Sequence, residues 1–252
     1  MAVNLINVEC DTPIYRIVSF ERLLEAIDTK KFTLVKPALW NDPYENFLLN
    51  ANGVLSDGRR VIFESIRESF YGQCWSLREE CDGLWRAFSA YGISVKIKST
   101  VSKVMEFFYD IGNPFHYLSY FIGRVEYIPT QEIHDFFSKN IDYLFTSDNL
   151  GLVQTLLIKR ATFDYEKEVR LIFDRPNNAT ADYIGVKNRW DNGNVFSFNI
   201  DINYVIEEIV FDPRISVSLF KSMENTLRSL GYLGTIKRSD LYDKPQFVAK
   251  LW

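Results

Sequence analysis

The stretch DYEKEVRLIF, Asp164 to Phe173, carries a charged residue at every second position from Glu166 to Arg170. Side chains of a β-strand alternate between its two faces, so Glu166, Glu168 and Arg170 are predicted to share one face. The other face would be apolar and would join the core through Val169, Leu171 and Phe173. The charged face has two interpretations: a solvated surface with cross-strand ion pairs, or the wall of a site.

Short alternating runs and one-sided helical patterns mix along the chain without a regular strand–helix–strand rhythm. Strands are predicted at 14–18, 32–35, 72–77, 93–97, 123–128, 195–198, 208–211 and 235–237. Helices are predicted at 20–30, 61–70, 83–91, 101–109, 131–145, 150–160 and 217–230, with a loop at 177–178. The pattern indicates an α+β fold in one domain, residues 1–252, with mixed or antiparallel central sheets and flanking helices.

The segment WNDPYE, residues 40–45, has the features of a helix start. Asp42 is a candidate N-cap, Pro43 would take the first helical position, and Glu45 stands three residues after the cap. The structural interpretation is therefore the main one for Asp42 and Glu45. Asn41 and Asp42 are also candidates for the border of a pocket.

Composition and net charge limit the classes of function that this chain can have. The chain has 252 residues, 47% of them hydrophobic, a net charge of −4 and three cysteines without metal-ligand spacing. This charge argues against a broad electrostatic grip on nucleic acid, and the cysteines suit a reducing compartment. The N-terminal residues lack a signal-peptide pattern, and no apolar run approaches the roughly 18 residues of a membrane span. We expect a soluble cytoplasmic protein with no membrane partner.

Several familiar sites are absent from the sequence. It contains no G-x-G-x-x-G dinucleotide fingerprint and no phosphate-binding loop. The two histidines, His116 and His134, stand far apart and are predicted to be structural. Asp164 and Glu166 could hold Mg²⁺, but no second acidic cluster with a suitably spaced lysine supports a nuclease, so no metal site is predicted. The chemistry is left to carboxylates, arginine, serine and aromatic residues.

Several short motifs stand at intervals along the chain. They are Tyr15-Arg16, Asn41-Asp42-Pro43-Tyr44-Glu45, Cys74-Trp75-Ser76, Trp85, Tyr91-Gly92, Lys159 and Glu166-Lys167-Glu168-Val169-Arg170. In this order they resemble a large bacterial and prophage family of unknown function with an Asn-Asp-Pro-aromatic-Glu signature, from about Ile14 onward. The resemblance gives no mechanism.

A second resemblance does imply a mechanism. The mono-ADP-ribosyltransferase superfamily carries an arginine on an early strand, a serine on a middle strand and a glutamate at the start of a late strand. This sequence is similar in having Arg16, Ser76 and Glu168 in that order, with Glu166 as the first member of a Glu-x-Glu pair. It departs from the superfamily in having Cys-Trp-Ser where Ser-Thr-Ser is usual. The resemblance implies an ADP-ribosyltransferase-like fold with NAD as substrate.

The same resemblance implies a role for each residue. Glu168 would stabilise the oxocarbenium-like transition state of NAD cleavage and hold the ribose hydroxyls. Arg16 would pair with phosphate or ribose oxygens, and Ser76 would orient Glu168 or the ribose. Glu166 would act as general base toward the acceptor. The remaining expected NAD-binding residues, several of them able to stack on a ring, are Tyr15, Trp75, Trp85, Tyr91 and Asn41.

Two functional hypotheses follow. The first is an NAD-dependent ADP-ribosyltransferase, a toxin or anti-phage effector that modifies a protein or nucleic acid acceptor and has a neutralising antitoxin or regulator as a partner. The alternative is a non-enzymatic prophage or defence module that binds a protein partner. In the second case Arg16 is the polar face of an outer strand, and Ser76 is an ordinary buried serine. Trp85 is then core. The discriminating question is whether Arg16, Ser76 and Glu168 meet in one cleft.

Overall fold

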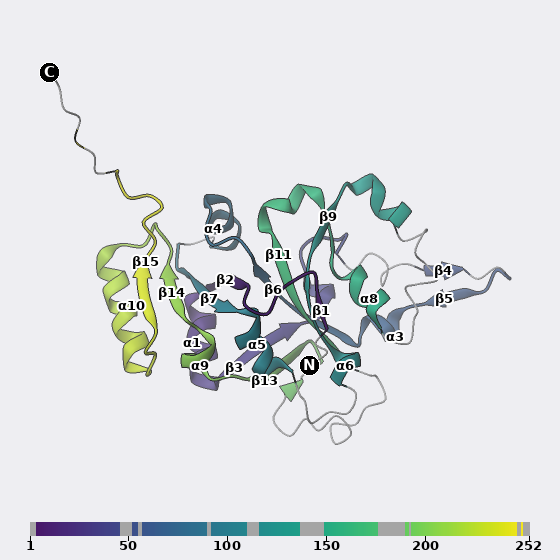
Figure 1. Cartoon of the computed structure of the whole chain (residues 1–252), viewed down its shortest axis with the longest axis horizontal. Helices are drawn as coiled ribbons and strands as arrows, with labels where there is room; N and C mark the ends of the chain where they lie inside the picture. Colours follow the sequence, from purple (N-terminus) through teal and green to yellow (C-terminus); the bar gives the residue numbers. More distant parts are fainter. Residues whose placement is uncertain are drawn as a thin grey trace.

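The computed structural model describes residues 4–45, 52–54, 57–89, 92–109, 116–136, 149–175, 190–191, 193–245 and 248. These residues form an α+β fold in which one large mixed sheet is flanked by helices (Figure 1). This is the predicted fold class. The described residues contain no helix long and apolar enough to cross a membrane.

The large sheet has eleven strands among the described residues. They are β1 (Leu5–Ile6), β2 (Pro13–Ser19), β3 (Lys31–Val35), β6 (Phe70–Ser76), β7 (Ser94–Thr100), β8 (Tyr120–Arg124), β11 (Glu168–Asp174), β12 (Trp190–Asp191), β13 (Val195–Asn199), β14 (Glu208–Phe211) and β15 (Thr235–Arg238). Two small two-stranded sheets pair β4 (Asn52–Val54) with β5 (Arg60–Ile62), and β9 (Glu126–Ile128) with β10 (Ile158–Arg160).

The large sheet branches at β6. One side of β6 pairs with β11 along its full length, from Glu168↔Ser76 to Asp174↔Phe70. Its other side is shared: Ser76 pairs with Tyr15 of β2, and Gly72 pairs with Val35 of β3. Beyond these single pairs the sheet continues as two arms, β2-β7-β14-β15 and β3-β13-β12. We call the opening between the arms, beside Cys74, the fork.

Helices cover the sheet and its ends. They are α1 (Phe20–Thr29), α3 (Glu64–Arg67), α4 (Asp82–Phe88), α5 (Val101–Phe108), α6 (His116–Ser119), α8 (Leu150–Thr155), α9 (Ile202–Val205) and α10 (Val217–Ser229), with the 3-10 turns η1 (Pro37–Leu39) and η2 (Ala161–Glu166). Serine caps explain where α1 and α10 begin, because Ser19 and Ser216 accept the amide protons of Arg22 and Leu219. Helix α10 lies alongside β14 and β15 at one end of the molecule (Figure 1).

Strand β11 is buried on both faces. Val169, Leu171 and Phe173 belong to the main hydrophobic cluster, as the alternation predicted. Ile172 packs into a second cluster with Phe121 and Leu156. All seven residues of β11 are buried, so its charged face is not a solvated surface.

Three predicted elements differ from the structure. The helix predicted at 61–70 is only α3, because residues 60–62 pair as β5 with β4. The helix predicted at 150–160 ends at Thr155, and Ile158–Arg160 forms β10, parallel to β9. The strand predicted at 123–128 is interrupted at Val125, which separates β8 from β9. In each case strand pairing outweighs local helix periodicity or strand continuity.

Other predicted elements are confirmed with small shifts at their ends. The strands predicted at 14–18, 32–35, 72–77, 93–97, 195–198, 208–211 and 235–237 correspond to β2, β3, β6, β7, β13, β14 and β15. Helices α1, α4, α5 and α10 fall where predicted, although α4 ends at Phe88. Residues 130–136 are helical, and the rest of the helix predicted to 145 lies outside the described residues, as does the loop at 177–178. After Asp42, residues 43–45 form a turn, and any continuation as a helix lies outside the described range.

Candidate active site

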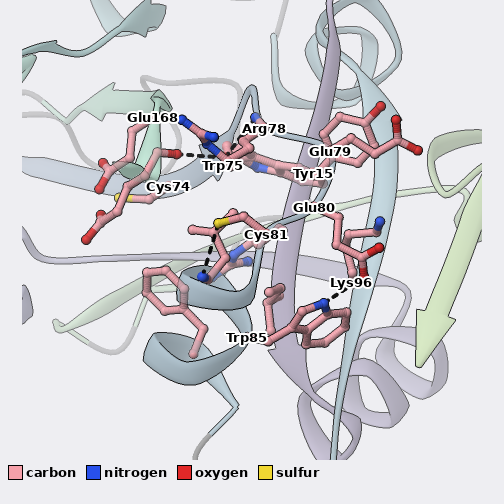
Figure 2. A pocket seen from close by; sticks show the side chains of 16 residues that line it. Tyr15, Cys74, Trp75, Arg78, Glu79, Glu80, Cys81, Trp85, Lys96 and Glu168 are labelled. Carbon is pink, nitrogen blue, oxygen red and sulfur yellow. Dashed lines mark hydrogen bonds between the residues drawn. The ribbon is translucent and has the colours of Figure 1, made fainter. Parts of the chain in front are cut away.

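A pocket of about 170 Å³ opens between β2 and β6, on the β2 side of the fork and next to α4 (Figure 2). Its lining combines charged, aromatic and thiol side chains: Tyr15, Arg16, Ile17, Cys74, Trp75, Ser76, Arg78, Glu79, Glu80, Cys81, Leu84, Trp85, Phe88, Lys96, Glu166 and Glu168. Cys74 and Glu168 lie toward one end of the pocket, and Lys96, Glu79 and Glu80 toward the other (Figure 2). The pocket exists because β2 and β6 part after one backbone pair, Tyr15↔Ser76.

Arg16 follows that last pair, at the point where the strands diverge. Its side chain is half-buried and lines the pocket. In the described part of the chain the Arg16 guanidinium makes no hydrogen bond and no ion pair, and burial lowers its pKa. A guanidinium stays charged in proteins, and a desolvated charge without a counter-charge is unfavourable. The pocket therefore offers an unsatisfied site for an anionic or oxygen-rich ligand.

The carboxyl groups of Glu166 and Glu168 face the pocket from either side of a sharp turn. Glu166 ends η2, Lys167 takes the left-handed conformation with φ of 45°, and Glu168 begins β11. Glu166 is thus not in the strand, contrary to the prediction from the alternation. The left-handed residue reverses the chain locally and keeps both carboxyl groups on the same side.

Backbone contacts hold this turn in place. The Ser76 hydroxyl donates to the Glu166 carbonyl at 2.6 Å and accepts the Arg78 amide at 3.0 Å. The Tyr127 hydroxyl accepts the Glu168 amide at 2.8 Å. Ser76 thus contacts the backbone of Glu166, and among the described residues its hydroxyl makes no hydrogen bond with the Glu168 carboxylate. Ser76 therefore supports the turn between Glu166 and Glu168.

A buried lysine joins three glutamates. The Lys159 ammonium lies 2.7 Å from Glu45, 2.6 Å from Glu166 and 2.6 Å from Glu168. All four side chains are at most 7% exposed. Because Lys159 belongs to β10, this contact depends on the strand that the sequence pattern predicted as helix.

Arg170 supplies the second buried cation. Its Nε lies 2.6 Å from Glu168, and one terminal nitrogen lies 3.2 Å from Glu45. The other donates to the Leu156 carbonyl at 2.7 Å, and the guanidinium stacks 4.3 Å from the centre of the Trp40 ring. Arg170 is fully buried. We call Glu45, Lys159, Glu166, Glu168 and Arg170 the buried charge network.

The two pocket glutamates differ in protonation. Burial, followed by the hydrogen bond with Glu168, raises the pKa of Glu166 to about 8. Burial acts in the same direction on Glu168, but Arg170, the Glu166 hydrogen bond and Lys159 together hold the pKa of Glu168 far below its ordinary value. At neutral pH Glu166 is therefore mainly protonated and Glu168 ionised. Opposed shifts in neighbouring carboxyl groups are typical of acid–base sites.

The tryptophan side chains of the pocket wall are buried and hydrogen-bonded. Trp75 is 2% exposed and donates its indole N–H to Gln73 at 2.7 Å, and Trp85 is fully buried and donates to Glu80 at 2.7 Å. Tyr15 is 7% exposed, with the Lys96 ammonium 5.5 Å from its ring centre. Both tryptophans are thus core residues with one surface at the pocket, which limits them to edge or partial stacking contacts.

Seven of the nine residues singled out from the sequence line this one pocket. They are Tyr15, Arg16, Trp75, Ser76, Trp85, Glu166 and Glu168. Asn41 is exposed and is not part of the lining, and Tyr91 lies outside the described residues. Arg16, Ser76 and Glu168, on the neighbouring strands β2, β6 and β11, thus line the same pocket.

The sequence interpretation missed Glu45 and Lys159 as members of the site. Both stand in the succession of motifs quoted above, and Glu45 closes the Asn-Asp-Pro-Tyr-Glu segment. A helix-start interpretation explained that segment locally and hid its long-range contacts. Asp42 likewise reaches Arg160, whose Nε and a terminal nitrogen donate to its carboxylate at 3.1 and 2.8 Å.

Three further lining residues carry reactive groups: Cys74, Cys81 and Lys96. Burial raises the pKa of the Cys74 thiol, which is therefore neutral. Cys81 accepts the Leu84 amide at the start of α4. Burial lowers the pKa of Lys96, which is 3% exposed. Among the described residues no group of three or more histidine, cysteine, aspartate or glutamate side chains is arranged to hold a metal ion.

Comparison with known proteins finds similarity at the level of structure. No protein-family model matches the sequence, and no curated protein matches it. Among solved structures, DarT of Thermus sp. 2.9 in complex with carba-NAD+, with NAD+ and with ADP-ribosylated ssDNA aligns with this chain at a TM-score of 0.39 and 11% identity. The alignments cover 92%, 92% and 91% of this chain and 97%, 98% and 94% of those chains.

Proposed function

We propose that this protein is a mono-ADP-ribosyltransferase-like enzyme that uses NAD as its substrate and acts as a toxin or anti-phage effector. The observation that carries the proposal is the meeting of an unpaired Arg16 guanidinium and the Glu166–Glu168 carboxyl pair in one aromatic-walled pocket. Cation, carboxylate and acid–base group are the three functions that cleavage of a nucleotide glycosidic bond requires.

The proposed reaction is a substitution at the ribose of NAD. The bond from ribose C1′ to the nicotinamide nitrogen breaks, and nicotinamide leaves with the electron pair. The ionised Glu168 carboxylate stabilises the positive charge that develops on the ribose. The acceptor atom then bonds to C1′, and its proton passes to Glu166 in its ionised form. A base with a pKa of about 8 is well placed for this step near neutral pH.

The size of the pocket supports partial enclosure of the substrate. Sites that enclose a drug-sized ligand have volumes of roughly 300–1,000 Å³, and this pocket has about 170 Å³. One ring with its sugar fits that space better than a whole dinucleotide. We therefore place the nicotinamide ribose in the pocket and the rest of NAD beyond its mouth, with Arg16 pairing with a phosphate or ribose oxygen.

The first test is loss of transfer in single variants. With labelled NAD and a mixture of protein and single-stranded nucleic acid acceptors, Glu168→Gln should lower transfer by about 100-fold or more, because a neutral amide cannot stabilise the ribosyl cation. Arg16→Ala should weaken NAD binding measured by calorimetry. Glu126→Gln, an exposed position on neighbouring β9, is the matched control and should leave both unchanged.

Folded Glu168→Gln and Arg16→Ala proteins with full transfer activity would refute these roles. If the wild-type protein neither binds NAD nor modifies any acceptor, the non-enzymatic alternative gains weight. A pull-down from host cells, in which Glu168→Gln captures the same protein partner as wild type, would then support an interaction module.

A further inference from the structure

The Asn-Asp-Pro-Tyr-Glu segment has no part in the reaction proposed above, yet the fold fixes it firmly. The Asp42 carboxylate accepts the Tyr44 amide at 3.0 Å, and the Asp42 carbonyl accepts the Glu45 amide at 3.0 Å. Arg160 then clamps the same carboxylate through two hydrogen bonds. The turn directs the Glu45 side chain inward, where it is 5% exposed.

The Glu45 carboxylate meets both cations of the buried charge network. One oxygen lies 2.7 Å from the Lys159 ammonium, and the other lies 3.2 Å from the Arg170 guanidinium. Lys159 and Arg170 are also the two cations that contact Glu168, and Lys159 is the cation that contacts Glu166. Glu45 therefore competes with the pocket glutamates for the same counter-charges.

The balance of charges in the network limits how many of its carboxyl groups can be ionised. Within the network, three carboxyl groups face two cations, so full ionisation would leave one uncompensated negative charge away from water. Such a charge is strongly unfavourable, and the usual remedy is that one carboxyl group keeps its proton. Glu45 is held between both cations and Glu168 touches both, whereas Glu166 touches only Lys159. The proton therefore stays on Glu166, next to Glu168 and facing the pocket.

We propose that Glu45 is a positioning residue of the active site: by engaging Lys159 and Arg170 it keeps one proton on the Glu166–Glu168 pair. This inference rests on the proposed function only where it concerns catalysis. The number of protons on the carboxyl groups of the buried charge network does not depend on what the pocket binds. It gives the Asn-Asp-Pro-Tyr-Glu segment a role in the site that the start of a helix would not explain.

Other groups around the pair do not supply this effect. The titratable and charged groups on the surrounding elements are Cys74 on β6, Cys81 before α4, Tyr127 on β9, Lys159 on β10, Tyr165 on η2 and Arg170 on β11. Arg16, Arg78, Glu79, Glu80 and Lys96 also line the pocket. Among the described residues none of these five forms an ion pair or hydrogen bond with Glu166 or Glu168. The pKa of the Cys74 thiol and of the Tyr127 and Tyr165 hydroxyls is raised, chiefly by burial, so these groups are neutral near pH 7. Glu45 is the described carboxylate beyond the pair that contacts both buried cations.

The test is a pH titration of the glutamate carboxyl carbons by NMR, with the Glu166 signal assigned by its loss in Glu166→Gln. In the wild-type protein the Glu166 midpoint should lie near 8. Glu45→Gln frees one cation and should lower that midpoint by about one pH unit or more. Glu45→Asp keeps the charge and should restore the midpoint toward the wild-type value.

Asp42→Asn is the control for loosening of the turn, since it weakens the Arg160 clamp without changing the charge of the network. An equal shift in Asp42→Asn and Glu45→Gln, or no shift in folded Glu45→Gln, would overturn the proposal. A wild-type Glu166 midpoint near 4.5 would overturn it without any variant. These readouts are independent of catalysis, so a protein with no transferase activity but the expected titration would refute only the proposed function.

Where transfer is measurable, the pH profile adds a kinetic readout. The rate should rise with pH as Glu166 ionises, and Glu45→Gln should move this rise to lower pH by the same amount as the NMR midpoint. A uniform fall in rate with an unmoved profile would indicate a merely structural role for Glu45.

Discussion

Glu166 and Glu168 are the same residue type two positions apart, and the fold gives them opposite charge states. Both are buried, so burial alone would protonate both. The difference is Arg170, whose guanidinium contacts Glu168 and not Glu166. A single contact thus divides the pair into a fixed anion and a proton carrier.

The protonated Glu166 predicts an unusual pH dependence of stability. Its folded-state pKa of about 8 lies above the ordinary 4.5. Between these values the unfolded chain loses the proton and the folded protein keeps it, so the free energy of unfolding falls as pH rises. Relative to Glu166→Gln, wild type should lose up to about 1.4 kcal/mol per pH unit in this window.

Urea unfolding of both proteins from pH 5 to pH 8 measures this difference. Asp174, whose pKa burial raises to about 6, acts in the same direction below pH 6 and is common to both proteins. The comparison therefore isolates Glu166. Parallel pH curves for the two proteins would contradict the assignment of the proton.

At the scale of elements, the junction between η2 and β11 decides whether the two carboxyl groups face the same pocket. Lys167 has φ of 45°, in the left-handed region that favours glycine and asparagine over most residues. Its carbonyl accepts the Leu77 amide at 2.8 Å, which ties the junction to the end of β6. The turn, and not the strand alternation, sets the geometry of the pair.

Substitution at Lys167 tests this junction. A β-branched residue strongly disfavours the left-handed conformation, so Lys167→Val should lower the free energy of unfolding by about 1–2 kcal/mol. Lys167→Asn accepts the conformation and serves as the matched control, since it removes the same ammonium group. Equal stability of the two variants in urea unfolding would show that the left-handed residue is not needed.

Elements whose identity depends on pairing between segments were not predicted from the sequence. Amphipathic patterns and caps predicted α1, α5 and α10, because the information is local to each helix. Lys159 was missed because β10 is a three-residue strand whose identity depends on its pairing with β9, about thirty residues upstream in the chain. Glu45 was missed for a related reason: its local pattern fits a helix start, and its partners lie on distant strands.

At the scale of the whole molecule, branching of the sheet brings together residues that are far apart in sequence. Arg16, Ser76 and Glu168 stand on β2, β6 and β11, which are adjacent in the sheet. Their order along the chain could be read from sequence by resemblance. Their meeting could not, because it depends on the single pair Tyr15↔Ser76, after which the strands part.

The proposed toxin activity predicts a cellular effect of the intact pocket. Induced expression of the wild-type protein in a bacterial host should arrest growth, because NAD is consumed and an acceptor is modified. Glu168→Gln, expressed at the same level, should permit growth. The measurement is the growth curve together with cellular NAD content. Growth arrest by both proteins, with NAD unchanged, would contradict the enzymatic interpretation.

The branch in the sheet also bears on self-association. An open sheet ordinarily ends in two edges, each with unpaired backbone groups that can recruit a strand from another molecule. Among the described residues this sheet ends in three, at β1, β12 and β15. Strand β1 has two residues, and β15 carries Lys237 and Arg238. Short strands and positive charge are known barriers to edge-to-edge aggregation. Short length at β1 and positive charge at β15 thus protect these two edges against edge-to-edge aggregation.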